Sequence, residues 1–364
     1  MPDKTISVFG VIMAGGVGSR FWPRSREKNP KQLISILGNE TMIQQTFNRL
    51  KKIIPNRNNF IITNKLQRSQ IIKQLPEVPQ ENIISEPIGR NTAPCIGLAA
   101  LFIHRLNPEG VMVVVPADHI IKDVDEFNTV IESAVDVASK TSALVTIGIK
   151  PNRPDTGYGY IQFDEKVVKT KNHHTSYKVK AFAEKPNIET AQKFLESGEF
   201  LWNSGMFVWR CDAILNEIKK SLPELYNFLD SLKDSIGTNL MDSKISDIYS
   251  KIKSISIDHG VMEKSENVLV FKGNFGWNDV GSWDEVVRLS EKDENGNTVQ
   301  GNIVMIDTKN SFLYSSNKII ATVGVEDLIV INTDDAILIC KKNESQNVKK
   351  IVDHLRIKQM NEYL

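Results

Sequence analysis

The sequence contains few cysteines: Cys95, Cys211 and Cys340 are the only ones in 364 residues. Their odd number and wide spacing argue against a disulfide framework and favour a reducing compartment. The sequence has no CxxC pair, so the cysteines give no sign of a zinc site. We interpret them as structural thiols.

Long hydrophobic runs and an excess of one charge are also missing. The apolar run Val8–Ala14 is far shorter than the roughly 20 residues of a membrane-spanning helix, and it lacks the form of a secretory signal. The net charge of +1 gives no general attraction to nucleic acid or to an anionic membrane. We therefore expect a cytoplasmic protein that binds neither nucleic acid nor a membrane.

The first half of the chain alternates apolar, strand-like runs with amphipathic helical segments. Continuous apolar strands are typical of a parallel sheet that is buried on both faces. The strand-like runs are Val8–Ala14, Asn59–Thr63, Glu81–Ser85, Val111–Pro116 and Leu144–Ile149, and the helical segments are Met42–Ile54, Leu66–Gln74, Ala93–Leu106 and Glu126–Ser139. The pattern predicts an α/β, doubly wound, Rossmann-like domain.

The pattern changes after residue 285. Short apolar runs recur there at spacings of roughly 8–10 residues with polar turns between them, which indicates a small all-β unit. The runs are Ile303–Ile306, Phe312–Tyr314, Ile319–Val323, Leu328–Ile331 and Ile337–Cys340, and an apolar stripe of Val348, Ile351, Val352 and Leu355 predicts a final helix. We predict domains at 1–285 and 286–364. The stripe packs either on its own domain or on a second subunit.

A glycine-rich loop, AGGVGSR at residues 14–20, directly follows the first predicted strand. Glycines let the backbone approach phosphates closely, and successive N–H groups form an anion-binding nest. The loop lacks the GK[ST] ending of a Walker motif and the GxGxxG spacing of a dinucleotide site, which argues against an NAD-dependent dehydrogenase. Alone it fits a simple glycine turn equally well. Lys31, which follows a proline, favours a polyphosphate site.

Two acidic residues are candidates for a metal site. Asp118 follows the strand Val111–Pro116, at the edge where α/β domains bind ligands, and Asp279 lies in the motif WNDVGSW. Mg²⁺ takes few protein carboxylates and completes its octahedron with phosphates and water. A turn-forming aspartate and a helix cap are the alternatives. His119 is interpreted as a packing residue, because histidine is an uncommon Mg²⁺ ligand.

Several spaced motifs together resemble the mannose-1-phosphate guanylyltransferases, or GDP-mannose pyrophosphorylases, a branch of the sugar nucleotidyltransferases. The motifs are MAGGVGSRFWPRSREKNPKQL, EPIGRNTAPCIGLAA, VVPADHII, GYGYI, AEKP, WNSGMFVW, SIDHGVMEK and WNDVGSW. The resemblance implies a GT-A-like nucleotidyltransferase domain and a small left-handed β-helix-like domain with a helix used in dimerisation. We accordingly expect a homodimer. Longer relatives carry an additional isomerase domain that this sequence does not reach, so we expect no phosphomannose isomerase activity.

The resemblance also assigns roles to residues. It implies that the phosphate-binding groups, the base pocket, the sugar-phosphate pocket and the Mg²⁺ ligands come from separate motifs. The phosphates are assigned to Ala14, Gly15, Gly16, Gly18, Arg20 and Lys31; the guanine pocket to Gly89, Arg90, Asn91 and Thr92, with Pro116 and Ala117 nearby; the sugar phosphate to Gly159, Glu184, Lys185 and Asn203; and the metal to Asp118 and Asp279. Without the resemblance, GRNT is as well explained by a capped helix start and EKP by a charged turn.

The implied reaction joins GTP and α-D-mannose 1-phosphate to give GDP-mannose and pyrophosphate. An ionised phosphate oxygen attacks the α-phosphorus, so no protein base is needed, and Arg20, Lys31 and Lys185 are the expected catalytic side chains. One alternative is the same chemistry with another nucleotide or with a heptose or glucose 1-phosphate. Another is a non-catalytic subunit that binds a nucleotide sugar and regulates a partner.

Overall fold

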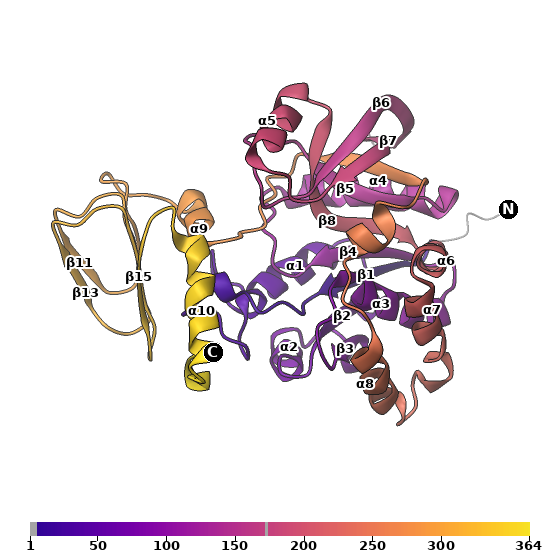
Figure 1. The fold of residues 1–364 in the computed structure, drawn as a ribbon, viewed down its shortest axis with the longest axis horizontal. Helices are drawn as coiled ribbons and strands as arrows, with labels where there is room; N and C mark the ends of the chain where they lie inside the picture. Colours follow the sequence, from indigo (N-terminus) through magenta and orange to yellow (C-terminus); the bar gives the residue numbers. More distant parts are fainter. Residues whose placement is uncertain (1–5, 172–173) are drawn as a thin grey trace. The chain divides into compact units, whose positions relative to one another are not determined.

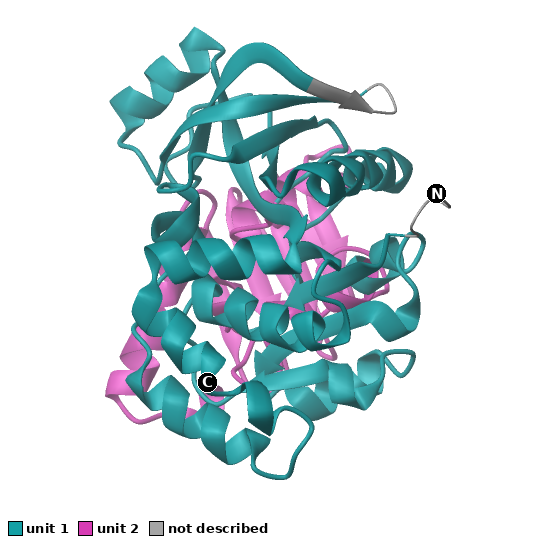
Figure 2. Cartoon of the chain, turned by 90° about the vertical axis from the view of Figure 1, so that its right-hand side faces the viewer, with its two compact units in different colours: residues 1–15, 46–278 teal, residues 16–45, 279–364 magenta. Residues whose placement is uncertain are grey.

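The computed structural model describes residues 6–171 and 174–364, and these form two compact units. Unit 1 consists of residues 1–15 and 46–278, and unit 2 of residues 16–45 and 279–364 (Figure 2). The chain passes from one unit to the other three times, at the Gly15–Gly16, Gln45–Thr46 and Asn278–Asp279 peptide bonds. The first and the last of these crossings lie inside motifs that the sequence had singled out. The domain boundary predicted at residue 285 divides the chain at one point along the sequence, and it stays a prediction.

Unit 1 is built on a mixed sheet of order β3-β2-β1-β4-β8-β5-β9-β7-β6 (Figure 1). Neighbouring pairs among β1–β4 are parallel, and β8 runs antiparallel to both β4 and β5. The predicted apolar runs all form strands of this sheet. The strands are β1 Val8–Met13, β2 Asn59–Asn64, β3 Ile83–Glu86, β4 Val111–Pro116, β5 Leu144–Ile149, β6 Tyr160–Lys171, β7 His174–Ala183, β8 Phe200–Arg210 and β9 Val268–Gly273.

Helices pack on this sheet, and α3 is the most deeply buried of those named here. All its residues from Ala93 to Ile103 are buried, and it contacts α6, α7 and β1. Gly97 allows this packing, because a Cβ there would lie 2.5 Å from Leu229 Cδ1. The predicted helices are confirmed as α1 Met42–Leu50, α2 Arg68–Gln74, α3 Thr92–Leu106 and α4 Val124–Thr141; α5 Ile188–Ser197, α6 Cys211–Ser221, α7 Pro223–Asp230 and α8 Met241–Lys251 follow. Across residues 6–171 and 174–364, no helix combines the length and the apolar character needed to cross a bilayer.

Unit 2 is a small β-helix-like domain with two helices against its strands. β10, β12 and β14 pair in parallel, β15 closes that sheet in antiparallel, and β11 pairs with β13. The predicted short strands are confirmed, whereas β10 was missed. The elements are β10 Thr298–Gln300, β11 Ile303–Ile306, β12 Phe312–Ser315, β13 Ile320–Val323, β14 Leu328–Asn332, β15 Ile337–Lys341, α9 Trp283–Leu289 and α10 Val348–Ile357.

The final helix uses its apolar stripe within its own unit. Val348 and Val352 are buried, and α10 contacts the short helix η1, Ser19–Phe21, which carries Arg20. Ile351, which the sequence placed in the same stripe, is 38 % exposed. The structure thus decides the question that the periodicity left open: Val348 and Val352 pack intramolecularly.

Candidate functional site

The carboxyl ends of β1 and β4 place three predicted nucleotide-binding residues side by side. The two strands are parallel, and their register ends at Met13 opposite Pro116. The N–H of Ala117 donates to the carbonyl of Met13 at 3.0 Å, and both Ala14 and Ala117 are almost fully buried. Asp118 is the next residue. Pro116 and Asp118 are half-buried at this edge of the sheet, which is where α/β sheets bind ligands.

The remainder of the glycine-rich loop belongs to unit 2, where Lys31 lies against it. Gly18 has a φ of +60°, and a Cβ there would lie 2.6 Å from Lys31 Cβ, so a glycine is needed. Gln32 donates to the carbonyl of Gly16 at 2.8 Å, and Ser25 donates to that of Val17 at 2.9 Å. The loop is therefore tied to the segment that carries Lys31.

Arg20 and Lys31 differ in how they are held. Arg20 is exposed on η1, whereas Lys31 is 4 % exposed and its Nζ donates to the backbone carbonyl of Asp279 at 2.6 Å. The same ammonium lies 5.4 Å from the centroid of the Phe21 ring. Lys31 is thus fixed in place, while the Arg20 guanidinium is presented to solvent, where it can reach an anion.

The GRNT segment caps the start of α3 and ties it to α8. Asn91 has a φ of +69°, and its side chain caps the helix by accepting from the Thr92 N–H at 2.8 Å. Arg90 donates from Nε to the carbonyl of Tyr249 at 3.0 Å and from Nη2 to that of Ser250 at 3.3 Å, at the end of α8. The capped-helix interpretation is therefore correct. The nucleobase role of Gly89, Arg90, Asn91 and Thr92 stays a prediction.

Glu86 is a buried carboxylate that the sequence reasoning did not assign. It ends β3 and is 4 % exposed, and its Oε1 has no hydrogen-bond partner. Its Oε2 lies 3.5 Å from the position that a Cβ on Gly15 would take. Burial raises the pKa of Glu86 to about 7, although a hydrogen bond with Tyr249 opposes the shift. A buried acceptor beneath the glycine-rich loop is costly unless a donor reaches it.

The predicted sugar-side residues meet in unit 1. A Cβ on Gly159 would lie 2.5 Å from Glu184 Oε2 and 3.5 Å from Asn203 Cβ, and the Asn203 N–H donates to the Gly159 carbonyl at 2.8 Å. Lys185 is exposed, and its Nζ lies 2.5 Å from Glu184 Oε1. The sequence reasoning therefore grouped Gly159, Glu184, Lys185 and Asn203 correctly in space.

Asp258 completes this cluster, and it was missed. Its Oδ1 accepts from Asn203 Nδ2 at 2.6 Å. Burial raises the pKa of Asp258, the Asn203 hydrogen bond opposes that shift, and the charge of Glu184 adds to it. The backbone N–H of the preceding Ile257 donates to Thr92 Oγ1 at 2.8 Å, which ties the segment to the start of α3. The motif SIDHGVMEK had been noted only as a mark of the family.

Aromatic rings connect the sugar-side cluster to the segment that follows β4. The Tyr158 ring lies 4.9 Å from Trp202 and 5.3 Å from Trp277, centroid to centroid. Trp277 Nε1 donates to His119 Nδ1 at 3.1 Å. His119 thus has a packing role, as the sequence indicated, and the aromatic residues form one wall within unit 1.

Asp118, in unit 1, and Asp279, the first residue of the second segment of unit 2, are both half-buried. Ile120 and Asn278 form an antiparallel bridge inside unit 1, two residues after Asp118 and one residue before Asp279. Val280, a β-branched residue, has a φ of +47°. Such strain is costly and occurs preferentially at functional sites. Among the described residues, no group of three or more His, Cys, Asp or Glu side chains is arranged to hold a metal.

Comparison with known families identifies two matched regions. Residues 9–296 match the nucleotidyl transferase family, and residues 301–355 match the MannoseP isomerase/GMP-like beta-helix domain. The first match covers most of the chain, and the second falls on the parallel strands of unit 2.

Curated relatives and solved structures agree with these matches. The chain is 38 % identical to mannose-1-phosphate guanylyltransferase 2 of Escherichia coli O157:H7 over 364 residues, which cover 98 % of this chain and 75 % of that relative. It is 40 % identical to the mannose-1-phosphate guanylyltransferase of Klebsiella pneumoniae over 357 residues, which cover 97 % of this chain and 75 % of that relative. A structure from Thermus thermophilus, described as a mannose-1-phosphate geranyltransferase, superposes with a TM-score of 0.85 at 29 % identity, over 96 % of this chain and 100 % of that one.

Proposed function

Because the chain belongs to the mannose-1-phosphate guanylyltransferases, within the nucleotidyl transferase family, we propose that it transfers GMP from GTP to α-D-mannose 1-phosphate. The products are GDP-mannose and pyrophosphate. The observation that carries the proposal beyond family membership is the sugar-side cluster, in which Glu184, Lys185, Asn203 and Asp258 combine hydroxyl acceptors with a phosphate-binding ammonium.

The chain's contribution to the reaction is positioning and charge neutralisation. A phosphate oxygen of mannose 1-phosphate attacks the α-phosphorus of GTP, the bond to the β-phosphate oxygen breaks, and its electron pair leaves with pyrophosphate. The attacking oxygen is already ionised at neutral pH, so no general base is required. Arg20 and Lys31 stabilise the charge on the departing pyrophosphate, and Lys185 orients the sugar phosphate.

Glu86 favours guanine as the base. Guanine presents two neighbouring donors, N1–H and the N2 amino group, whereas adenine has no donor at N1. The Oε2 atom of Glu86 lies 3.5 Å from the position of a Cβ on Gly15, and its other oxygen, Oε1, has no hydrogen-bond partner. A guanine that donates to this carboxylate from N1–H and N2 removes the cost of the buried, unpaired acceptor, whereas adenine, with an acceptor at N1 beside its N6 amino group, cannot present two neighbouring donors.

The sugar hydroxyls face three acceptors whose geometry is fixed. Asn203 is held on both sides, because its Nδ2 donates to Asp258 and its Oδ1 accepts from the Gly205 N–H at 3.1 Å. Glu184 lies against Gly159, where a larger residue would displace it. Fixed acceptors discriminate between sugars that differ in the direction of one hydroxyl, because an incorrect sugar leaves buried polar groups unpaired.

The residues present fit a Mg²⁺ ion. Asp118 and Asp279 supply hard carboxylate oxygens, the ligand type that Mg²⁺ prefers, and substrate phosphates and water would complete its octahedron. Asp118 and Asp279 would hold the ion, which when bound offsets the repulsion between the phosphate groups of the two substrates.

Pyrophosphate release from a panel of substrates tests the function. We expect release with GTP and mannose 1-phosphate in the presence of Mg²⁺ and none after chelation with EDTA. Faster release with another triphosphate, or with a heptose or glucose 1-phosphate, would favour the alternative nucleotidyltransferase. Tight binding of GDP-mannose without turnover of any pair would favour a regulatory subunit.

A homodimer is part of the proposal, and the outer face of the β-helix-like domain supports it. β11 and β13 pair with Ile306 opposite Val323, and the side chains of Val304, Ile306 and Val323 are 50 %, 56 % and 67 % exposed. Apolar side chains gathered on one face mark an interaction surface, and a second copy of the chain covers them here. Light scattering of the wild type and of Ile306→Lys tests this: the variant should be monomeric.

A cytoplasmic location is also part of the proposal. All three cysteines are free thiols, and Cys95 and Cys211 are buried in the hydrophobic core. A reducing compartment keeps such thiols in this form.

A further inference from the structure

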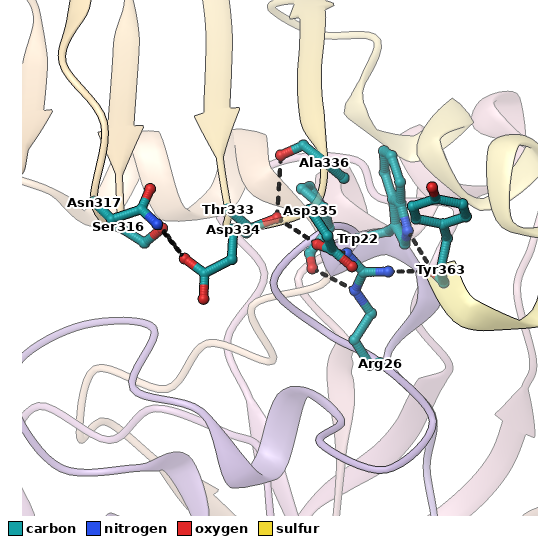
Figure 3. A network of polar contacts seen from close by, with 10 residues as sticks. Trp22, Arg26, Ser316, Asn317, Thr333, Asp334, Asp335, Ala336 and Tyr363 are labelled. Carbon is teal, nitrogen blue, oxygen red and sulfur yellow. Dashed lines mark hydrogen bonds and ion pairs between the residues drawn. The ribbon is translucent and has the colours of Figure 1, made fainter.

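The segment that follows Arg20 is fastened to the C-terminal part of the chain by a network of polar contacts within unit 2. Figure 3 shows Trp22 and Arg26 directed at Tyr363 and at the turn between β14 and β15. These residues lie outside the groups assigned to GTP, mannose 1-phosphate or Mg²⁺. Their position directly after Arg20 raises the question of what they control.

The Tyr363 carbonyl is the centre of this network. It accepts from Trp22 Nε1 at 2.9 Å and from Arg26 Nη1. Arg26 also donates from Nη2 to Asp335 Oδ1 at 2.7 Å and from Nε to the carbonyl of Pro23 at 2.8 Å. One guanidinium therefore joins the loop, the β14–β15 turn and the end of the chain. Arg26 is mostly buried, with 16 % of its side chain exposed.

Buried packing continues the connection to Arg20 itself. Trp283 Nε1 donates to the Trp22 carbonyl at 3.3 Å, and the Trp283 ring lies 5.1 Å from that of Phe21, centroid to centroid. Phe21 and Arg20 are consecutive residues of η1, against which α10 packs. The backbone on the C-terminal side of Arg20 is thus fixed by a hydrogen bond to Trp22, by ring packing at Phe21 and by a helix.

We propose that Trp22, Arg26 and Asp335 are positioning residues that hold Arg20 in place for the GTP phosphates, so that the C-terminal domain tunes nucleotide use as well as assembly. The inference rests on the proposed function, in which Arg20 meets the polyphosphate. Arg20 is exposed on a one-turn helix, and its placement depends on what holds that turn. Small displacements of a phosphate-binding group reduce rates strongly.

The β14–β15 turn supplies a matched pair of variants. Asp334 and Asp335 are neighbouring, exposed aspartates, but only Asp335 contacts Arg26; Asp334 accepts from Ser316 at 3.2 Å and from Asn317 at 2.6 Å (Figure 3). Asp335→Asn should lower kcat/KM for GTP about three- to tenfold, the effect of one hydrogen bond. It should leave KM for mannose 1-phosphate unchanged. Asp334→Asn removes the same charge and should behave as the wild type.

Trp22→Phe provides a second, independent test. It keeps an aromatic ring but removes the donor to Tyr363, and it should produce the same loss confined to GTP. Unfolding midpoints of all variants are measured in parallel. The inference is overturned if Asp335→Asn and Trp22→Phe keep wild-type GTP kinetics, if Asp334→Asn loses as much as Asp335→Asn, or if both substrates are affected equally and in proportion to lost stability.

Binding of a fluorescent methylanthraniloyl-GTP, measured without sugar phosphate, separates this inference from the proposed reaction. If the wild type binds this nucleotide but releases no pyrophosphate with mannose 1-phosphate, the proposed reaction fails, while a weaker affinity of Asp335→Asn still supports the positioning role. If the wild type turns over normally and Asp335→Asn binds with wild-type affinity and rate, the positioning role fails alone.

Discussion

Replacing Glu86 by glutamine should stabilise the folded protein, and increasingly so as the pH rises. Burial raises the pKa of Glu86 from an ordinary 4.5 to about 7. Because the folded pKa is the higher one, the carboxyl costs nothing below pH 4.5, where it is protonated in both states. The cost grows with pH and is complete above about 7, where the folded state must hold a buried charge.

The size of the effect follows from the shift. Each unit of pKa difference corresponds to about 1.4 kcal/mol, so the ionised carboxylate costs the folded state about 1 kcal/mol at pH 5 and about 3 kcal/mol at pH 8. Glutamine has nearly the same shape and never ionises. The free energy of unfolding of Glu86→Gln should therefore exceed that of the wild type by about these amounts.

Urea unfolding of the wild type and of Glu86→Gln at the two pH values measures this difference. Glu81→Gln is the control, because Glu81 lies just before β3 and is exposed, so its replacement should not change the pH dependence. The same Glu86→Gln variant should bind GTP more weakly, since an amide offers guanine one acceptor and a competing donor. A Glu86→Gln protein that is less stable at pH 8 would refute the reasoning, because it would mean that the buried carboxylate already has a strong partner.

Three further substitutions test the catalytic assignments. Lys31→Ala should lower kcat about 10²-fold with both substrates saturating, since a fixed charge near the leaving group is lost; unchanged turnover would remove Lys31 from the mechanism. Lys185→Ala should raise KM for mannose 1-phosphate about tenfold without changing KM for GTP, and an effect on GTP alone would contradict its role. Asp258→Asn should also raise KM for the sugar phosphate about tenfold, because Asn203 loses its charged acceptor; steady-state kinetics with wild-type values would exclude Asp258 from the sugar pocket.

The sequence predicted those parts of the fold in which burial leaves a continuous pattern. β1, β4 and β5 are buried on both faces and appear as unbroken apolar runs. β7 has only one buried residue in its described pattern, Ser176, and therefore shows no apolar run. Its pairing with β6 and β9 depends on contacts between distant segments, which local periodicity does not record.

Candidate site residues stood out in the sequence where their residue type is itself unusual, and they were missed where only their surroundings in the fold mark them. Glycines and a lysine after a proline signal a phosphate loop by their identity. Glu86 and Asp258 look like ordinary surface acids in the sequence. Their importance comes from burial and from the partners Tyr249 and Asn203, which lie far away along the chain. Arg90 shows the converse, because a conspicuous arginine is engaged with backbone carbonyls at the end of α8.

The groups proposed to act on GTP and those proposed to act on the sugar phosphate fold with different parts of the chain. Arg20 and Lys31 belong to unit 2 and depend on Trp283 and Asp279, whereas Lys185 and Asn203 belong to the mixed sheet of unit 1. The chain passes between the units inside the glycine-rich loop and inside WNDVGSW. A polyphosphate loop whose basic residues fold with a β-helix-like domain gives that domain a direct influence on nucleotide binding. This influence does not require the C-terminal domain to touch the sugar, and it explains why loss of a contact such as Arg26–Asp335 should affect one substrate and spare the other.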